Sequence, residues 1–178
     1  MTAPAPSSAL VILVPEAEAA VGRMRRKLDP SSSSGMPAHV SILYPFAPSD
    51  LLSDDVATRL TALFGAHQPF AFTLSELGWF DTRVLYVVPA PAGRFVTLTT
   101  AVAAAFPEYP PYRGAYPDIV PHMTVGEGAR PARMRRAARR LGSGLPLEAR
   151  AHEVCLMAPD GAGRWAVVRR FALGGLGP

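Results

Sequence analysis

The chain has 178 residues, of which 49% are hydrophobic and 18% charged types, so it can bury a sizeable core and is not intrinsically disordered. Its single cysteine, Cys155, excludes an internal disulfide framework and a cysteine-based zinc site. Because Cys155 lies in an apolar run, we expect a buried, reduced thiol.

The net charge of +4 is unevenly distributed along the chain. Six arginines lie between Arg130 and Arg140 with no acid among them, so the rest of the chain is net negative. Only one of the 18 basic residues is a lysine, and arginine suits planar, bidentate contact with phosphate. A general bias towards arginine codons explains the same composition, and the sequence leaves both interpretations open.

Targeting and membrane signals are weak. No apolar stretch approaches the ~20 residues that cross a bilayer. The apolar run 9–14 has no basic residue before it and is followed by Glu16 and Glu18, which is unlike a signal peptide. We therefore expect a cytoplasmic monomer without a membrane partner. It should fold as one domain over residues 1–178, with a disordered, Pro- and Ser-rich lead at about 1–8.

The first half of the chain alternates strand and helix patterns. Residues 10–14 form a continuous apolar run, which is typical of a strand buried on both faces. Residues 16–28 have apolar side chains at helical spacing, and the serine-rich stretch after Pro30 has no periodicity and predicts a loop. The patterns then predict a strand at 39–46, a helix at 50–64 and a strand at 70–74.

The second half repeats this order. Its patterns predict strands at 84–88, 122–125, 153–157 and 165–173, helices at 95–106 and 131–141, and a Pro- and Tyr-rich loop at 107–121. His39 and His122 are 83 residues apart, and so are Phe72 and Cys155. This predicts a bilobal α+β fold, with two pseudo-symmetric α+β lobes whose antiparallel sheets face a central cleft. The alternative is a chance agreement in strand order.

Two tetrapeptides carry the candidate chemistry: His39-Val40-Ser41-Ile42 and His122-Met123-Thr124-Val125. Side chains alternate along a strand, so each strand presents one imidazole and one hydroxyl on the same face. One such tetrapeptide is weak evidence, but two copies at equivalent places in the two halves favour a function over core packing. The other two histidines, His67 and His152, have polar neighbours and are predicted to lie at the surface.

Two imidazoles on either side of a phosphate can cleave a phosphodiester by acting as general base and general acid. With an unperturbed pKa near ~6.5, a neutral ring can take a proton from water while a charged ring protonates the departing oxygen. The hydroxyls of Ser41 and Thr124 can donate to the non-bridging oxygens. No carboxylate lies within three residues of His39 or His122, so we expect neither a metal site nor a cofactor.

The paired motifs resemble those of the 2H phosphoesterase superfamily, which includes RNA 2′,3′-cyclic phosphodiesterases and bacterial 2′-5′ RNA ligase-like proteins. The segments 39–46 and 120–125 are most similar to the latter group, and the resemblance covers about residues 9–173. It implies a bilobal fold and metal-independent hydrolysis of a cyclic phosphodiester, with His39 and His122 sharing the acid and base roles. The sequence does not choose between those roles.

This sequence departs from the family pattern in two places. Position 41 is Ser where Thr is commoner, which keeps the hydroxyl but loses a methyl that stiffens the rotamer. Some members carry an arginine five residues after the second histidine to contact phosphate. Here that residue is Glu127, and Arg130 is the nearest substitute. The acid argues against strong binding of a long or multiply phosphorylated RNA.

Several other residues are candidates for substrate contacts. Tyr44 and Tyr116 flank the motif strands and could stack on a base or sugar, or else pack at the rim. Strict alternation places Tyr44 on the face opposite His39, so its role in the site requires a strand end or a bulge. Trp79 and Phe80 are predicted to form a hinge or pack in the core. The arginine-rich helix at 131–141 either lines a groove wall, binds RNA phosphates or is simply solvated.

Three functions compete at this point. The first is a metal-independent cyclic phosphodiesterase that acts on an RNA end or a small nucleotide and can also run 2′-5′ RNA ligation in reverse. The second is an RNA- or nucleotide-binding module without turnover, which the intact histidine and hydroxyl pairs argue against. The third is the same chemistry on a non-RNA metabolite. The basic helix favours RNA, whereas Glu127 favours a compact substrate.

Overall fold

In residues 7–175, the part of the chain that the computed structural model describes, eight strands form two four-stranded antiparallel sheets. In the first sheet the strand order is β2-β1-β7-β8, and in the second it is β5-β4-β3-β6. The strands are Ala9–Leu13 (β1), His39–Leu43 (β2), Phe70–Phe80 (β3), Val84–Ala90 (β4), Met123–Glu127 (β5), Leu147–Ala151 (β6), Glu153–Pro159 (β7) and Trp165–Ala172 (β8).

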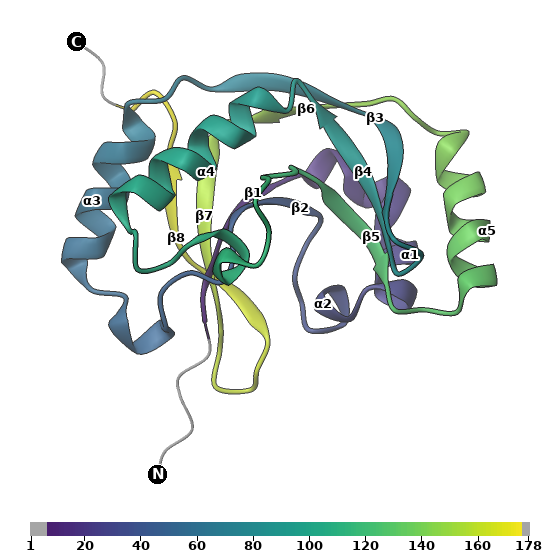
Figure 1. Ribbon diagram of the computed structural model, residues 1–178, viewed down its shortest axis with the longest axis horizontal. Coiled ribbons are helices and arrows are strands. Elements are labelled where there is room, and N and C mark those ends of the chain that lie inside the picture. The colour runs from purple at the N-terminus through teal and green to yellow at the C-terminus, as the bar shows by residue number, and fades with distance from the viewer. Residues whose placement is uncertain (1–6, 176–178) are drawn as a thin grey trace.

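The helices cover the outer faces of the two sheets, as Figure 1 shows. They are Glu18–Leu28 (α1), Pro30–Ser33 (α2), Asp54–Gly65 (α3), Gly93–Ala105 (α4) and Pro131–Gly142 (α5). The helix that follows β1 packs on β5, and the helix that follows β4 packs on β2. Similarly, α3 packs on β8 and α5 on β3. Each sheet is therefore covered by one helix from each half of the chain.

The predicted bilobal α+β architecture is confirmed, but the lobes are not the two halves of the chain. The equivalent orders β2-β1-β7 and β5-β4-β3 show an exchange: β3 of the first half joins the sheet of β4 and β5, while β7 and β8 of the second half join the sheet of β1 and β2. A short turn after Phe80 explains one exchange, because it folds β3 directly back onto β4 as an antiparallel neighbour.

Strand alternation divides the buried side chains into two clusters. Val40 and Ile42 of β2, and Met123 and Val125 of β5, point into the main core that both sheets share. The strand β1 is buried on both faces, as predicted. Its second face contributes to a small apolar cluster of Ala9, Val11, Met36, Cys155 and Met157. Cys155 is a fully buried free thiol, which also agrees with the sequence prediction.

Three local predictions were wrong. The serine-rich stretch forms the short helix α2, because the side chain of Asp29 caps it by accepting a hydrogen bond from the Ser31 amide at 2.9 Å. Trp79 and Phe80 are not a hinge but the last residues of β3. The strand β6 was missed, since its short sequence carries only small buried alanines and gives little hydrophobic alternation.

Residues 7 and 8 are ordered, although they belong to the segment 1–8 that was predicted to be disordered. Ser7 forms a β-bridge with Pro48, and the hydroxyl of the buried Ser8 donates to the Ala47 carbonyl at 2.7 Å. The first six residues of that segment lie outside the described part of the chain.

Candidate active site

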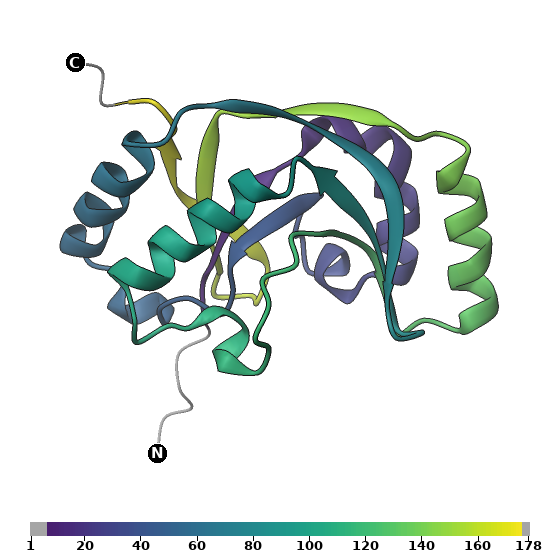
Figure 2. The same ribbon diagram turned by 45° about the horizontal axis from the view of Figure 1, so that its top comes forward.

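The two motif histidines occupy matching positions at the starts of their strands. His39 is the first residue of β2, and His122 immediately precedes β5, which begins one residue later than predicted. The two strands contact each other, and both views show them beginning near the middle of the molecule and running outward (Figures 1 and 2). The charge of His122 also lowers the pKa of His39, so the two rings lie within electrostatic range.

The same backbone contact fixes the tautomer of both rings. The Nδ1 of His39 lies 2.8 Å from the carbonyl oxygen of Pro37, and the Nδ1 of His122 lies 2.7 Å from that of Val120. A carbonyl oxygen can only accept a hydrogen bond, so Nδ1 carries the proton in each ring and acts as the donor. In the neutral imidazole this leaves the Nε2 lone pair free to take a proton from a ligand.

The pKa values of both imidazoles are lowered, which favours the neutral form. Burial lowers the pKa of His39 to about 4, the Pro37 contact opposes this, and the nearby Arg25 guanidinium lowers the pKa further. Burial also lowers the pKa of His122, while its hydrogen bond to Val120 and the Glu127 carboxylate raise it. A bound phosphate anion would raise both pKa values, which is what one ring needs in order to serve as the acid.

The two hydroxyls lie beside the histidines as predicted. In β2 the burial alternates, so that Val40 and Ile42 are buried while His39 and Ser41 are partly exposed. Thr124 is likewise partly exposed and sits opposite Tyr86 of β4. Within residues 7–175 neither hydroxyl forms a hydrogen bond, so both are available to a ligand.

Tyr44 lies immediately after β2, which ends three residues earlier than predicted. The predicted strand 39–46 stops at Leu43, so strict alternation no longer governs position 44. The ring of Tyr44 is 46% exposed and meets Trp165 edge-on, with ring centroids 6.1 Å apart. Trp165 packs on the small apolar cluster that includes Val11, the cross-strand neighbour of Ser41. Trp165 was not predicted from the sequence to be part of this surface.

Tyr116 lies in the loop before β5, in which the Tyr112 amide donates to the Tyr44 carbonyl at 3.1 Å, and Arg130 lies after β5. Tyr116 is 68% exposed and packs against Tyr112, where both line a cavity of about 240 Å³ beside α4. Arg130 follows the opposite end of β5 from His122, and that five-residue strand spans about 15 Å. Arg130 is exposed and contacts neither histidine within the described residues. The structure thus brings together His39, His122, Ser41 and Thr124, while Tyr44 and Tyr116 lie on either side of Tyr112 and Arg130 lies beyond the far end of β5.

Two aromatic rings that were not predicted support His122. Phe80 meets it edge-on with centroids 4.9 Å apart, and Tyr86 lies at 5.4 Å. The ring of Tyr86 rests on Gly78, where a Cβ would come within 2.3 Å of it. The sequence could have indicated Tyr86, because it lies in the middle of the predicted strand 84–88 and its side chain points away from the face of Leu85 and Val87.

A β-bulge changes the orientation of Glu127. The pairing of β4 with β5 shifts register between Leu85 and Tyr86, so Gly126 opposes the buried Leu85 and Glu127 opposes Val84. Val84 and Tyr86 alternate to the same face of β4, so Glu127 shares the face of His122. This geometry explains why its carboxylate raises the pKa of His122. Strict alternation from the sequence would have placed Glu127 on the opposite face.

A buried ion pair anchors the segment that leads into His39. Arg25 and Asp29 are 1% and 3% exposed, and their side chains meet at 2.7 Å. Arg25 also donates to the Met36 carbonyl at 3.2 Å, while Asp29 accepts from both the amide and the hydroxyl of Ser31. The charges of both members act on the pKa of His39. This pair therefore ties α1 to the backbone that holds the first imidazole.

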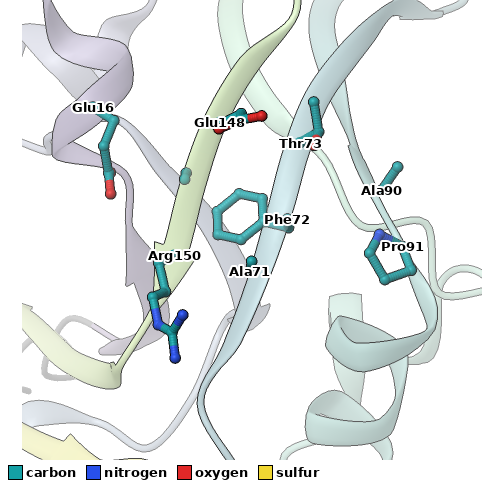
Figure 3. A pocket seen from close by; sticks show the side chains of 9 residues that line it. Glu16, Ala71, Phe72, Thr73, Ala90, Pro91, Glu148 and Arg150 are labelled. Carbon is teal, nitrogen blue, oxygen red and sulfur yellow. The ribbon is translucent and has the colours of Figure 1, made fainter.

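A separate cavity lies away from the histidines. It measures about 510 Å³ and lies along β3 and β6, where Glu16, Glu148 and Arg150 contribute its charged side chains (Figure 3). Neither histidine lines it. In residues 7–175 no group of three or more His, Cys, Asp or Glu side chains is arranged to hold a metal ion. No helix in the same range is both long and apolar enough to span a membrane.

Comparison with known proteins agrees with this geometry. The family model of the 2′-5′ RNA ligase superfamily matches residues 13–163. The solved structure of TT0787 from Thermus thermophilus is similar with a TM-score of 0.64 at 21% identity, covering 95% of this chain and 98% of that one. E. coli LigT complexed with 3′-AMP has a TM-score of 0.58 at 19% identity, covering 96% and 99%. The LigT complex with NADP+ gives the same values. The search of curated proteins returned no match.

Two four-stranded sheets that each present a His-x-Ser/Thr strand, together with this likeness, show that the chain shares the fold of TT0787 and LigT. The match over most of its length shows that the chain belongs to the 2′-5′ RNA ligase superfamily, the 2H phosphoesterases.

Proposed function

We propose that the protein hydrolyses 2′,3′-cyclic phosphodiesters at RNA ends or in small nucleotides, without a metal ion, by two-histidine acid–base catalysis. One observation carries this proposal. Both His39 and His122 donate from Nδ1 to a carbonyl two residues earlier, which leaves two Nε2 atoms free beside two hydroxyls. The nucleotides bound to E. coli LigT, 3′-AMP and NADP+, support a nucleotide substrate.

The reaction transfers one proton at each ring. One neutral imidazole takes a proton from water at Nε2, and the water oxygen forms a bond to phosphorus. The bond from phosphorus to the 2′ or 3′ oxygen breaks, and the other ring, charged at that moment, donates its proton to this oxygen. The product is a phosphomonoester with a free neighbouring hydroxyl. Ser41 and Thr124 donate to the non-bridging oxygens and orient the phosphate.

The same groups can catalyse attack by an RNA 5′-hydroxyl in place of water, which joins two ends through a 2′-5′ linkage. Water is present in large excess and opening the cyclic phosphate is downhill, so hydrolysis dominates. Tyr44, beside Trp165 at the end of β2, is placed to stack on the base or sugar of the substrate.

Turnover of 2′,3′-cyclic mononucleotides and of an RNA with a cyclic end tests the proposal, with and without EDTA. We expect activity that survives EDTA and has a bell-shaped pH profile. His39→Ala and His122→Ala should each lose at least ~10²-fold in kcat. His67→Ala and His152→Ala serve as matched controls and should retain activity. Complete loss in EDTA, or full activity in His39→Ala, would refute the mechanism.

A further inference from the structure

The helices α1 and α5 form a continuous outer layer on the second sheet. They contact each other, and the Arg133 side chain donates to the Lys27 carbonyl at 3.4 Å. Their apolar residues point inward: Leu28 of α1, and Met134 and Leu141 of α5, are all buried. Most of the exposed positions on the two helices are basic. This basic surface consists of Arg23, Arg26, Lys27, Arg133, Arg135, Arg136, Arg139 and Arg140.

The charges of the basic surface are not neutralised within the protein. None of its eight residues belongs to an ion pair among the described residues. The helix α5 contains no acid at all. Several of its arginines are instead spaced three or four residues apart, as are Arg136 and Arg139 or Arg136 and Arg140, which is a repulsive arrangement on a helix. This repulsion destabilises a helix face that is only solvated, whereas a bound polyanion would neutralise it.

The chemistry of the surface favours phosphate over a lipid bilayer. Seven of its eight cations are arginines, which can contact phosphate oxygens in a bidentate manner. A helix that binds membranes inserts an apolar face into the lipid. Here the apolar residues of α5 are already buried against the sheet, so none remains for insertion.

The basic surface lies on the opposite face of the second sheet from His122, with α1 packed on β5 and α5 on α1 and β3. The strand β5 is at the edge of its sheet, with His122 and Thr124 on one face and α1 packed on the other. To reach α1 and α5 from the histidines, a phosphate backbone has to pass around the edge strand β5, which is about 15 Å long.

We propose that the basic surface of α1 and α5 binds the phosphate backbone of an RNA whose cyclic end occupies the histidine site. This inference deepens the proposed function and rests on it for the placement of the RNA end. It assigns the protein to RNA-linked substrates in preference to free cyclic mononucleotides. It also accounts for Glu127. The Glu127 carboxylate repels additional phosphates near His122, while the outer helices bind the RNA backbone.

The test compares wild type with the variant Arg136→Gln/Arg139→Gln/Arg140→Gln. Glutamine keeps the helix propensity and removes repulsion, so the variant should melt no lower than wild type. The matched control, Arg94→Gln/Arg150→Gln/Arg169→Gln, removes the same charge from exposed positions elsewhere. Each protein is assayed on a 2′,3′-cyclic mononucleotide and on a cyclic-ended RNA. Binding of a fluorescent single-stranded RNA is titrated at several salt concentrations.

We expect the KM for the cyclic-ended RNA to rise at least about tenfold in the α5 variant, with kinetics on the mononucleotide unchanged. The slope of log affinity against log salt should become shallower by about 2, since single-stranded nucleic acid releases about 0.7 counterion per contact. The control should change neither quantity.

Equal RNA affinity and salt slope in wild type and the α5 variant would overturn the inference. Tighter binding of wild type to vesicles of acidic phospholipid than to RNA would also overturn it. If wild type turned over none of the substrates, the proposed function would fail, and the RNA titration would still decide whether the surface binds RNA.

Discussion

Removing the charge of Asp29 should destabilise the protein strongly. Asp29→Asn keeps the shape of the side chain but leaves the Arg25 guanidinium buried without a counterion. Breaking a buried ion pair in this way costs about 3–5 kcal/mol. For a chain of this length each kcal/mol lowers the melting temperature by about 2–4 °C, so we expect a decrease of about 6–20 °C. Urea and thermal unfolding measure the change.

Two further variants separate charge burial from other effects. Arg25→Met/Asp29→Leu removes both buried charges and should be more stable than Asp29→Asn, because the desolvation cost disappears together with the attraction. Its kcat should still fall, because Arg25 no longer anchors the Met36 carbonyl three residues before His39. Arg169→Gln breaks an exposed, 3.7 Å ion pair and should leave the midpoint unchanged. An Asp29→Asn protein as stable as wild type would refute this reasoning.

Two other predictions concern the histidines. The pKa of His39 is lowered from 6.5 to about 4, so the unfolded chain binds a proton that the folded one does not. The free energy of unfolding should therefore be fully retained above pH 6.5 and fall by about 3 kcal/mol towards pH 4. His39→Gln should flatten this dependence, and equal pH slopes in urea unfolding would contradict it. Gly78→Ala should displace Tyr86 from its place beside His122 and lower kcat by up to about 10²-fold, whereas Gly93→Ala, whose added Cβ meets open space, should not. Unchanged turnover in Gly78→Ala would show that Tyr86 does not position the ring.

Features with a short, regular period could be predicted from the sequence. Alternation along two strands was enough to place Val40 and Ile42 in the core and to leave His39 and Ser41 partly exposed. The equal spacing of the motifs was enough to predict two equivalent lobes. The exchange of β3 and β7 between the sheets was not predictable in this way, because periodicity describes one strand at a time and carries no information about its neighbours.

Features that depend on local irregularity or on burial were missed. The orientation of Glu127 follows from a register shift opposite Leu85 and Tyr86, and nothing in the local pattern marks that bulge. Strict alternation does not govern Tyr44, because β2 ends at Leu43. Arg25 looks like one of several arginines on α1 until the fold buries it against Asp29.

The exchange of strands between the sheets makes the two halves interdependent. Severing the chain in the turn after Phe80 would leave the first fragment without β7 and β8, and the second without β3. Neither piece could complete a sheet alone, so each imidazole is held in place partly by the opposite half of the polypeptide. The separation of His39 and His122 is thus set by strand pairing throughout the molecule rather than by a hinge between independent lobes. Fragments cut at this turn should recover a working site only by reassembling with each other.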